Sequence, residues 1–237
     1  MRILYPCIRF LLLFVGNLRV TGRENIPETG PYILAVNHMS KADPPLLLLA
    51  TGPIALRFFA GEKWERHILF GPIMRWAGAI YINRREVDRR SLREALQALK
   101  DGSVFGLAPE GTRSRIGGLI KAKDGAAYLA ARAGAPIVPV GVVNTDQIGR
   151  RFSRLRRTQL ETHFGKPITM PDLGRRPKGV ELAAYTHYIM VHIAALLPER
   201  HWGYYAESPA LKALCNGVDP WPHCLAAEGL GDEVRSV

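Results

Sequence analysis

Tyr32-Ile33-Leu34-Ala35-Val36 is a short apolar run, and Asn37-His38-Met39-Ser40-Lys41-Ala42-Asp43-Pro44 follows it directly. An apolar run of this length without polar alternation predicts a strand that is buried on both faces of an α/β sheet. The strand ends where the polar residues begin. His38 is therefore expected at its carboxyl end, which is where open α/β sheets bind their ligands.

Asp43 stands immediately before Pro44-Pro45 and a run of leucines. Because proline favours the first helical position and restricts the residue before it, Asp43 is predicted to be the N-cap of a helix. Its carboxylate can then turn back across the loop and form a hydrogen bond with His38. The alternative is that Asp43 only caps the helix and that His38 is an ordinary histidine at a strand end. These residues alone leave both interpretations open.

Strand and helix patterns alternate along the rest of the chain. Strands are predicted at 18–22, 53–60, 78–84, 103–108 and 137–143, and helices at 86–100, 126–133 and 180–197. This alternation predicts an α/β fold with a mostly parallel central sheet flanked by helices. If the strands run the same way, His38, Arg84, Glu110 and the residues after Val140 all emerge at one edge.

Composition narrows the class of protein and its partners. The 237 residues suit one large domain, and 47% hydrophobic with 22% charged residues is typical of a globular protein. A formal net charge of +11 predicts an anionic partner, which is a nucleic acid, a membrane surface or a phosphorylated substrate. The three cysteines form no CxxC pair, and this favours a reducing compartment.

The N-terminal residues are strongly apolar but too few to span a bilayer. Residues 3–15 fall short of the roughly 20 residues that a spanning helix needs, and they carry Arg9 within the run. We therefore predict an interfacial membrane helix at 1–17, with a helix packed on the protein's own core as the alternative. An α/β domain is expected at 18–206, and an irregular tail at 207–237.

An arginine-rich run occupies residues 150–157 and contains five arginines. Such runs can bind nucleic acid. The chain shows no aromatic RNA-binding pattern, zinc finger or helix-turn-helix that would read bases, so no nucleic-acid partner is predicted.

Four blocks together are more specific than any one of them. They are Asn37–Pro44, Gly78-Ala79-Ile80-Tyr81-Ile82-Asn83-Arg84, Leu107-Ala108-Pro109-Glu110-Gly111-Thr112-Arg113-Ser114, and Ile137-Val138-Pro139-Val140-Gly141-Val142. In this order they resemble the motifs of the 1-acylglycerol-3-phosphate acyltransferase family, the lysophospholipid acyltransferases. The resemblance covers roughly residues 20 to 165.

The resemblance implies a glycerol-3-phosphate acyltransferase-like fold and a specific reaction. A fatty acyl group would move from acyl-CoA or acyl carrier protein to the free hydroxyl of 1-acylglycerol 3-phosphate, making phosphatidate for phospholipid biosynthesis. The thioester is a co-substrate, and no metal or other cofactor is implied. The expected location is the cytoplasmic face of a membrane with an anionic surface, in peripheral or monotopic association.

The same resemblance assigns roles to individual residues. His38 and Asp43 match the catalytic pair, in which histidine serves as general base and aspartate orients it. Residues matching the substrate site are Arg84, Glu110, Gly111, Thr112, Arg113, Lys123 and Pro139. Among them, the arginines suit phosphate oxygens, the Gly111-Thr112 backbone is a candidate oxyanion donor, and Pro139 falls on the acyl-donor side.

The nucleophile and the acceptor are less determined. The chain has no G-x-S-x-G, so the acceptor's own hydroxyl is expected to attack, with Ser40 as the nearest protein alternative. Ala108 and Ala122 stand where many family members carry aromatic residues, which leaves acceptor and chain-length preference open. One alternative function is transfer to glycerol 3-phosphate, a glycolipid or an aminolipid. Another is a non-catalytic, basic membrane-binding module.

Overall fold

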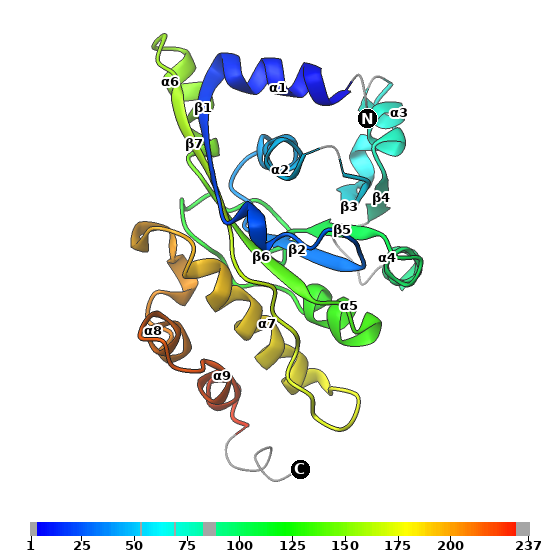
Figure 1. Ribbon diagram of the computed structural model, residues 1–237, viewed down its shortest axis with the longest axis vertical. Coiled ribbons are helices and arrows are strands. Elements are labelled where there is room, and N and C mark those ends of the chain that lie inside the picture. The colour runs from blue at the N-terminus through cyan, green and yellow to red at the C-terminus, as the bar shows by residue number, and fades with distance from the viewer. Residues whose placement is uncertain (1–3, 53, 69, 83–88, 231–237) are drawn as a thin grey trace.

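A seven-stranded sheet forms the centre of the protein (Figure 1). The computed structural model describes residues 4–52, 54–68, 70–82 and 89–230, and all statements on structure refer to these residues. The strand order is β1-β7-β6-β2-β5-β3-β4. The strands are β1 (Gly16–Thr21), β2 (Tyr32–Val36), β3 (Leu56–Gly61), β4 (Ala79–Ile82), β5 (Val104–Leu107), β6 (Ile137–Val143) and β7 (Thr158–Phe164).

Five neighbouring strands run in the same direction. β2 pairs in parallel with β5 and β6, and β3 pairs in parallel with β4 and β5. β7 is antiparallel to β6, and β1 is parallel to β7, so these two strands run against the others. The predicted mostly parallel α/β sheet is confirmed. Because β2 and β5 are parallel neighbours, His38 and Glu110 follow them at the same edge of the sheet.

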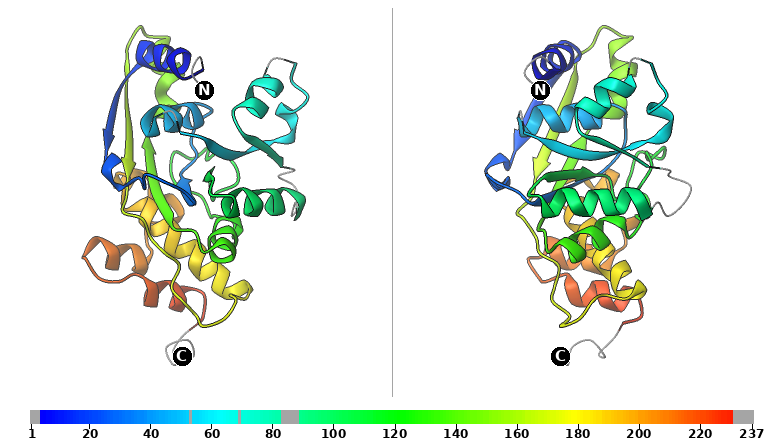
Figure 2. Two further views of the ribbon diagram at one scale, coloured as in Figure 1. Left: turned by 45° about the vertical axis from the view of Figure 1, so that its right-hand side comes forward. Right: turned by 90° about the vertical axis from the view of Figure 1, so that its right-hand side faces the viewer.

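Helices cover both faces of the sheet (Figures 1 and 2). Side chains alternate along β2, so Leu34 faces one core and Ile33 the other. The Leu34 face is covered by α1 and α2, which contribute Leu12 and Leu46 to its core. The Ile33 face is covered by α4, α5 and α7. The helices are α1 (Leu4–Val15), α2 (Asp43–Thr51), α3 (Phe70–Trp76), α4 (Arg89–Lys100), α5 (Gly125–Ala133), α6 (Ile148–Phe152), α7 (Gly179–Ala194), α8 (Pro209–Cys215) and α9 (Trp221–Ala227).

The apolar N-terminal segment forms α1, and its two sides have different surroundings. Leu12 is buried, and the Tyr5 hydroxyl donates to the Leu49 carbonyl of α2 at 3.4 Å. On the outer side, Phe10 and Phe14 are 77% and 62% exposed. No described helix combines the length and hydropathy needed to cross a bilayer. Membrane association of this helix stays a prediction.

The prediction of an irregular tail after residue 206 is wrong for the part that the structure describes. Two short helices, α8 and α9, fold back onto α7, where Leu211 and Cys224 are fully buried. Trp221 stacks on Tyr185 of α7 with ring centroids 5.1 Å apart. Each helix has only seven residues, so an apolar period of 3.6 repeats too few times to stand out in the sequence.

Candidate active site

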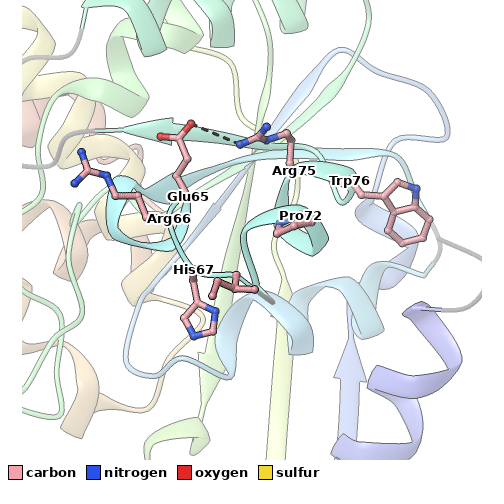
Figure 3. A pocket seen from close by; sticks show the side chains of 7 residues that line it. Glu65, Arg66, His67, Pro72, Arg75 and Trp76 are labelled. Atoms are coloured by element: carbon pink, nitrogen blue, oxygen red, sulfur yellow. Dashed lines mark ion pairs between the residues drawn. The ribbon is translucent and has the colours of Figure 1, made fainter.

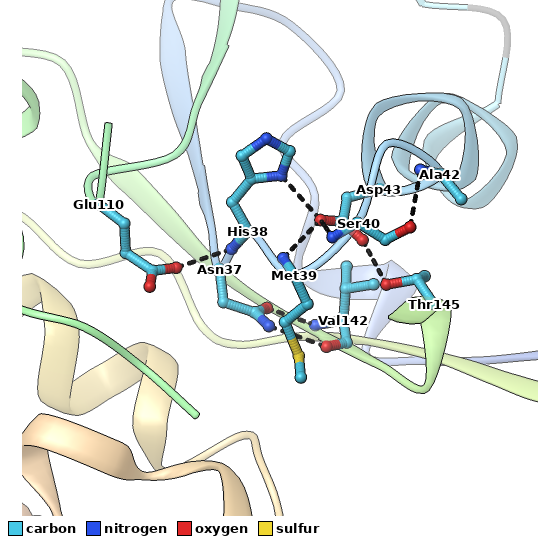
Figure 4. Close-up of polar contacts among 9 residues, drawn as sticks. All are labelled: Asn37, His38, Met39, Ser40, Ala42, Asp43, Glu110, Val142 and Thr145. Atoms are coloured by element: carbon cyan, nitrogen blue, oxygen red, sulfur yellow. Dashed lines mark hydrogen bonds and ion pairs between the residues drawn. The ribbon is translucent and has the colours of Figure 1, made fainter. Parts of the chain in front are cut away.

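The predicted catalytic pair meets at the carboxyl end of β2. His38 Nδ1 lies 2.8 Å from Asp43 Oδ2, and their side chains are 14% and 3% exposed (Figure 4). Asp43 is reached through a tight loop that ends at the start of α2. Two prolines follow it in the first helical turn, where backbone N–H groups have no intrahelical partner and proline is tolerated.

The Asp43 carboxylate is held from four directions. Oδ2 accepts hydrogen bonds from His38 Nδ1 and from the backbone N–H groups of Met39 and Ser40, at 2.8, 2.7 and 2.8 Å. Oδ1 accepts the hydroxyl of Thr145, which lies beyond β6. An oxygen that accepts this many donors belongs to an ionised carboxylate, so His38 Nδ1 must carry its hydrogen. In the neutral imidazole with its hydrogen on Nδ1, the other ring nitrogen, Nε2, carries a lone pair and can act as a base.

The structure corrects one expectation about this loop and adds one contact that was not expected. Asp43 is the first residue of α2 and Ala42 is the N-cap, because the Asp43 carboxylate turns back to the loop instead of capping the helix. Its charge still lies at the positive end of the helix dipole. Thr145 was not predicted. It lies 102 residues from Asp43, and no local pattern links the two.

Asn37 and Glu110 fix the backbone around the histidine. The Asn37 amide forms a paired contact with the Val142 backbone of β6, at 2.9 and 2.7 Å. Glu110 is 1% exposed, and its two carboxylate oxygens accept the backbone N–H groups of His38 at 2.7 Å and Ile120 at 3.0 Å. Burial raises the pKa of Glu110, and the two backbone hydrogen bonds oppose this. All these contacts of Glu110 are with the chain's own backbone, so they support the loop that carries His38.

An apolar cavity of about 460 Å³ opens beside His38. Its volume is in the range of sites that bind small organic ligands. Asp43 and Lys123 are among the few polar residues in its wall. The apolar lining comes from α1, α2, α3 and the strands between them, and includes Ile8, Leu47, Leu48, Leu56, Phe58, Phe59, Ile73, Met74 and Leu107.

The predicted substrate residues divide between the cavity and its surroundings. Gly111 and Lys123 line it, and a Cβ on Gly111 would lie 3.3 Å from Lys123 Cδ. The Gly111 N–H donates to the Ala108 carbonyl at 3.0 Å, so this amide is occupied and does not point to an oxyanion. Thr112 and Arg113 lie in the adjacent loop and Pro139 is buried within β6; none of these three lines the cavity. Arg84 lies outside the described residues.

A second hollow lies beside α3 (Figure 3). It has a volume of about 520 Å³. Glu65 and Arg75 form an exposed ion pair of 3.7 Å within it. It contains none of the predicted catalytic or substrate residues, so the cavity beside His38 is the better candidate for the active site.

Known proteins match both the sequence and the fold. A sequence profile described as Acyltransferase matches residues 17–143, more than half of the chain. The chain belongs to this acyltransferase family. The family assignment made from the four motifs is therefore confirmed, together with the prediction of an O-acyltransferase of phospholipid biosynthesis at the level of the family.

Individual relatives carry a more specific name. A 1-acyl-sn-glycerol-3-phosphate acyltransferase of Borreliella burgdorferi is 32% identical over 59% of this chain and 57% of the relative. One of Bacillus subtilis is 23% identical over 80% of this chain and 92% of the relative. The crystal structure of the 1-acyl-sn-glycerophosphate acyltransferase of Thermotoga maritima has a TM-score of 0.65 at 25% identity, covering 82% of this chain and 77% of that one.

Proposed function

We propose that this acyltransferase moves a fatty acyl group from a thioester to the free hydroxyl of 1-acylglycerol 3-phosphate, which yields phosphatidate. The donor would be acyl-CoA or acyl carrier protein. The observation that carries the proposal is a histidine–aspartate pair in the wall of a large apolar cavity. The names of the relatives supply the acceptor.

In this mechanism His38 is the general base. Nε2 removes the proton from the acceptor hydroxyl while the hydroxyl oxygen attacks the thioester carbonyl carbon. A C–O bond forms and the C–S bond breaks. The departing thiolate then takes the proton from the imidazolium, so the enzyme returns to its starting state. Asp43 orients the ring and stabilises the imidazolium that forms during the reaction.

Direct attack by the acceptor is supported by the surroundings of Ser40. Its hydroxyl oxygen accepts the Ala42 N–H at 3.2 Å, and its backbone N–H donates to Asp43. The ring nitrogen of His38 that faces this loop is already bonded to Asp43. The serine therefore helps to shape the loop, and the acceptor, the thioester and the enzyme react in one ternary complex.

The cavity offers different surfaces to the fatty acyl chain and to the phosphate of the acceptor. Its apolar walls suit a fatty acyl chain, because burying each methylene group contributes about 0.8 kcal/mol. Lys123, whose side chain runs past Gly111 at the cavity wall, supplies positive charge for the phosphate of the acceptor. Arg84 and Arg113 remain proposed partners of the same phosphate.

The proposed location is the cytoplasmic face of a membrane, with α1 lying in the interface. Phe10 and Phe14 are four residues apart, so they share the outer side of α1, where both are exposed. Phe10→Gln/Phe14→Gln is expected to reduce binding to anionic vesicles without changing the core. Undiminished binding would place the membrane contact elsewhere.

An acceptor panel tests the proposed reaction. Labelled acyl-CoA or acyl carrier protein is offered with 1-acylglycerol 3-phosphate, glycerol 3-phosphate, a glycolipid or an aminolipid, and the products are separated by thin-layer chromatography. Phosphatidate is the expected main product, and His38→Ala should abolish it with the fold intact. A different main product would show that the enzyme uses another acceptor than the one proposed. Equal turnover by His38→Ala would remove the base assignment.

A further inference from the structure

The arginine-rich run at 150–157 has no role in the acyl-transfer site, yet it has a defined structure. It forms the end of α6 and the turn that enters β7. The side chains of Arg150, Arg154 and Arg156 are exposed. Among these cations stand two apolar side chains, Phe152 at 48% and Leu155 at 95% exposure. We call residues 150–156 the basic turn.

Leu155 is unusual in its backbone as well as its exposure. Its φ is 54°, in the left-handed region that favours glycine and asparagine. A leucine in this conformation is strained, and here it recovers none of that cost by packing, because it lies almost wholly in water. The combination indicates a side chain that is buried only when something else approaches the turn.

The basic turn is joined to the outer side of α1. The Phe152 ring lies 6.2 Å from the Phe14 ring of α1. Directly after the turn, the Arg157 guanidinium donates to the carbonyl of Gly16, the first residue after α1, at 2.9 Å. In Figure 1 α6 and α1 lie next to each other at one end of the molecule. Exposed aromatic side chains therefore continue from α1 to the basic turn, although the two segments are more than 130 residues apart.

We propose that the basic turn is a second membrane contact that binds an anionic bilayer together with α1. Leu155 and Phe152 enter the interface, while Arg150, Arg154 and Arg156 bind lipid phosphates. Such pairing of an apolar anchor with a cluster of cations is what stable peripheral association requires. The inference deepens the proposed interfacial role of α1 and rests on it.

The charge and chemistry of the turn favour a bilayer over other occupants. A second copy of the chain related by a twofold axis would bring the same arginines face to face, and like charges repel. A nucleic acid would pair with the arginines but would leave an exposed leucine without an apolar partner. A lipid surface offers anionic headgroups and hydrocarbon side by side, which matches both kinds of side chain in the turn.

The proposal also orients the active site. Ile8 of α1 lines the cavity that contains His38, whereas Phe14 on the same helix contacts the basic turn. Two contacts at this end of the molecule would hold α1 flat against the bilayer. The cavity behind α1 would then lie next to the source of its fatty substrates.

Vesicle co-sedimentation of the full chain tests the proposal with two variants. Arg150→Gln/Arg154→Gln/Arg156→Gln removes three exposed cations of the basic turn and spares Arg157, which donates a hydrogen bond to the Gly16 carbonyl. Each arginine near an anionic surface contributes about fivefold in binding, so the triple variant should bind phosphatidylglycerol vesicles about a hundredfold more weakly. Leu155→Asn keeps a residue that tolerates positive φ and removes the apolar tip, and it should weaken binding several-fold even at high salt.

A matched control removes the same charge elsewhere. Arg93, Arg176 and Arg200 are exposed on α4, in the loop before α7 and after α7. Their triple glutamine variant should lose much less binding than the basic-turn triple. Pure phosphatidylcholine vesicles, inorganic phosphate and a duplex DNA complete the panel. Turnover on detergent-dispersed substrate should be unchanged in all variants, so a failed acyl-transfer proposal is recognised separately.

Three results would overturn the inference. Wild-type binding of phosphatidylglycerol vesicles by both basic-turn variants would exclude the turn as a membrane contact. Stronger binding of DNA than of vesicles, lost in the triple variant, would make the turn a nucleic-acid site. A dimer in solution that dissociates on Leu155→Asn would make it an interface between copies. Melting temperatures equal to that of the wild type establish that each variant is folded.

Discussion

Replacing Asp43 with asparagine removes one negative charge beside His38 while keeping an oxygen acceptor in almost the same place. In a catalytic triad this change costs about 10⁴-fold, because the histidine takes the wrong tautomer. Here the backbone N–H groups of Met39 and Ser40 both point at Oδ2. They should hold the asparagine carbonyl oxygen toward His38 and turn its NH₂ to Thr145, whose hydroxyl can rotate to accept. The tautomer is then preserved, and only the charge is lost.

The expected effect follows from that lost charge. Nδ1 and Oδ2 are 2.8 Å apart, so the charge centres of an imidazolium–carboxylate pair would lie about 4 Å apart. At an effective dielectric constant of about 20, such a pair interacts by about 4 kcal/mol. Each 1.4 kcal/mol changes a rate about tenfold, so kcat should fall about a thousandfold.

Steady-state kinetics with acyl-CoA and 1-acylglycerol 3-phosphate measure this change, with KM expected to vary little. Thr145→Val is the graded comparison, because it removes one donor and keeps the charge. It should reduce kcat by about tenfold, as the loss of a single hydrogen bond does. Near-normal kcat in Asp43→Asn would remove the electrostatic role of Asp43. A loss as complete as in His38→Ala would show that the amide orientation, and with it the tautomer, is not preserved.

Four further outcomes test other parts of the protein. Lys123→Ala should raise the KM for the phosphorylated acceptor by about ten- to over a hundredfold, since a charge-assisted hydrogen bond contributes about 1.5–3 kcal/mol. Lys121 lies outside the cavity wall, so Lys121→Ala should leave this KM unchanged. Equal KM values for the two variants would contradict the assignment of Lys123 to the phosphate. Glu110→Gln should lower the free energy of unfolding in urea by about 1–3 kcal/mol, because an NH₂ group would face a buried backbone N–H; an unchanged midpoint would refute its supporting role. Ser40→Ala should retain most turnover, and intact mass after incubation with acyl donor alone should show no adduct; a turnover-competent adduct would establish a covalent route. Burial lowers the pKa of His187, so on acidification the unfolded chain binds the proton before the folded protein does, and the free energy of unfolding should fall as pH drops below about 6.5. His187→Gln should make the free energy of unfolding less dependent on pH in this range, and an unchanged pH dependence would contradict the argument.

The class of fold and the place of the site at the end of β2 can both be read from the amino-acid sequence alone. The run Tyr32–Val36 is apolar throughout, and polar residues follow it from Asn37 onward. This short stretch therefore predicts both a buried strand and a candidate site at its carboxyl end. Alternating strand and helix periods then implied parallel neighbours. These are properties of adjacent residues, which hydrophobic period and proline position encode directly.

Which distant groups complete the site depends on how the strands are ordered in the folded protein. Thr145 and Glu110 contact the loop from His38 to Asp43 because β6 and β5 lie on either side of β2, and no local period of the sequence encodes the order of the strands. The same holds for the contact between Phe14 and Phe152, which depends on β1 pairing with β7 at the sheet's edge. It holds also for α8 and α9, which are too short to show a period and form because α7 offers them an apolar surface.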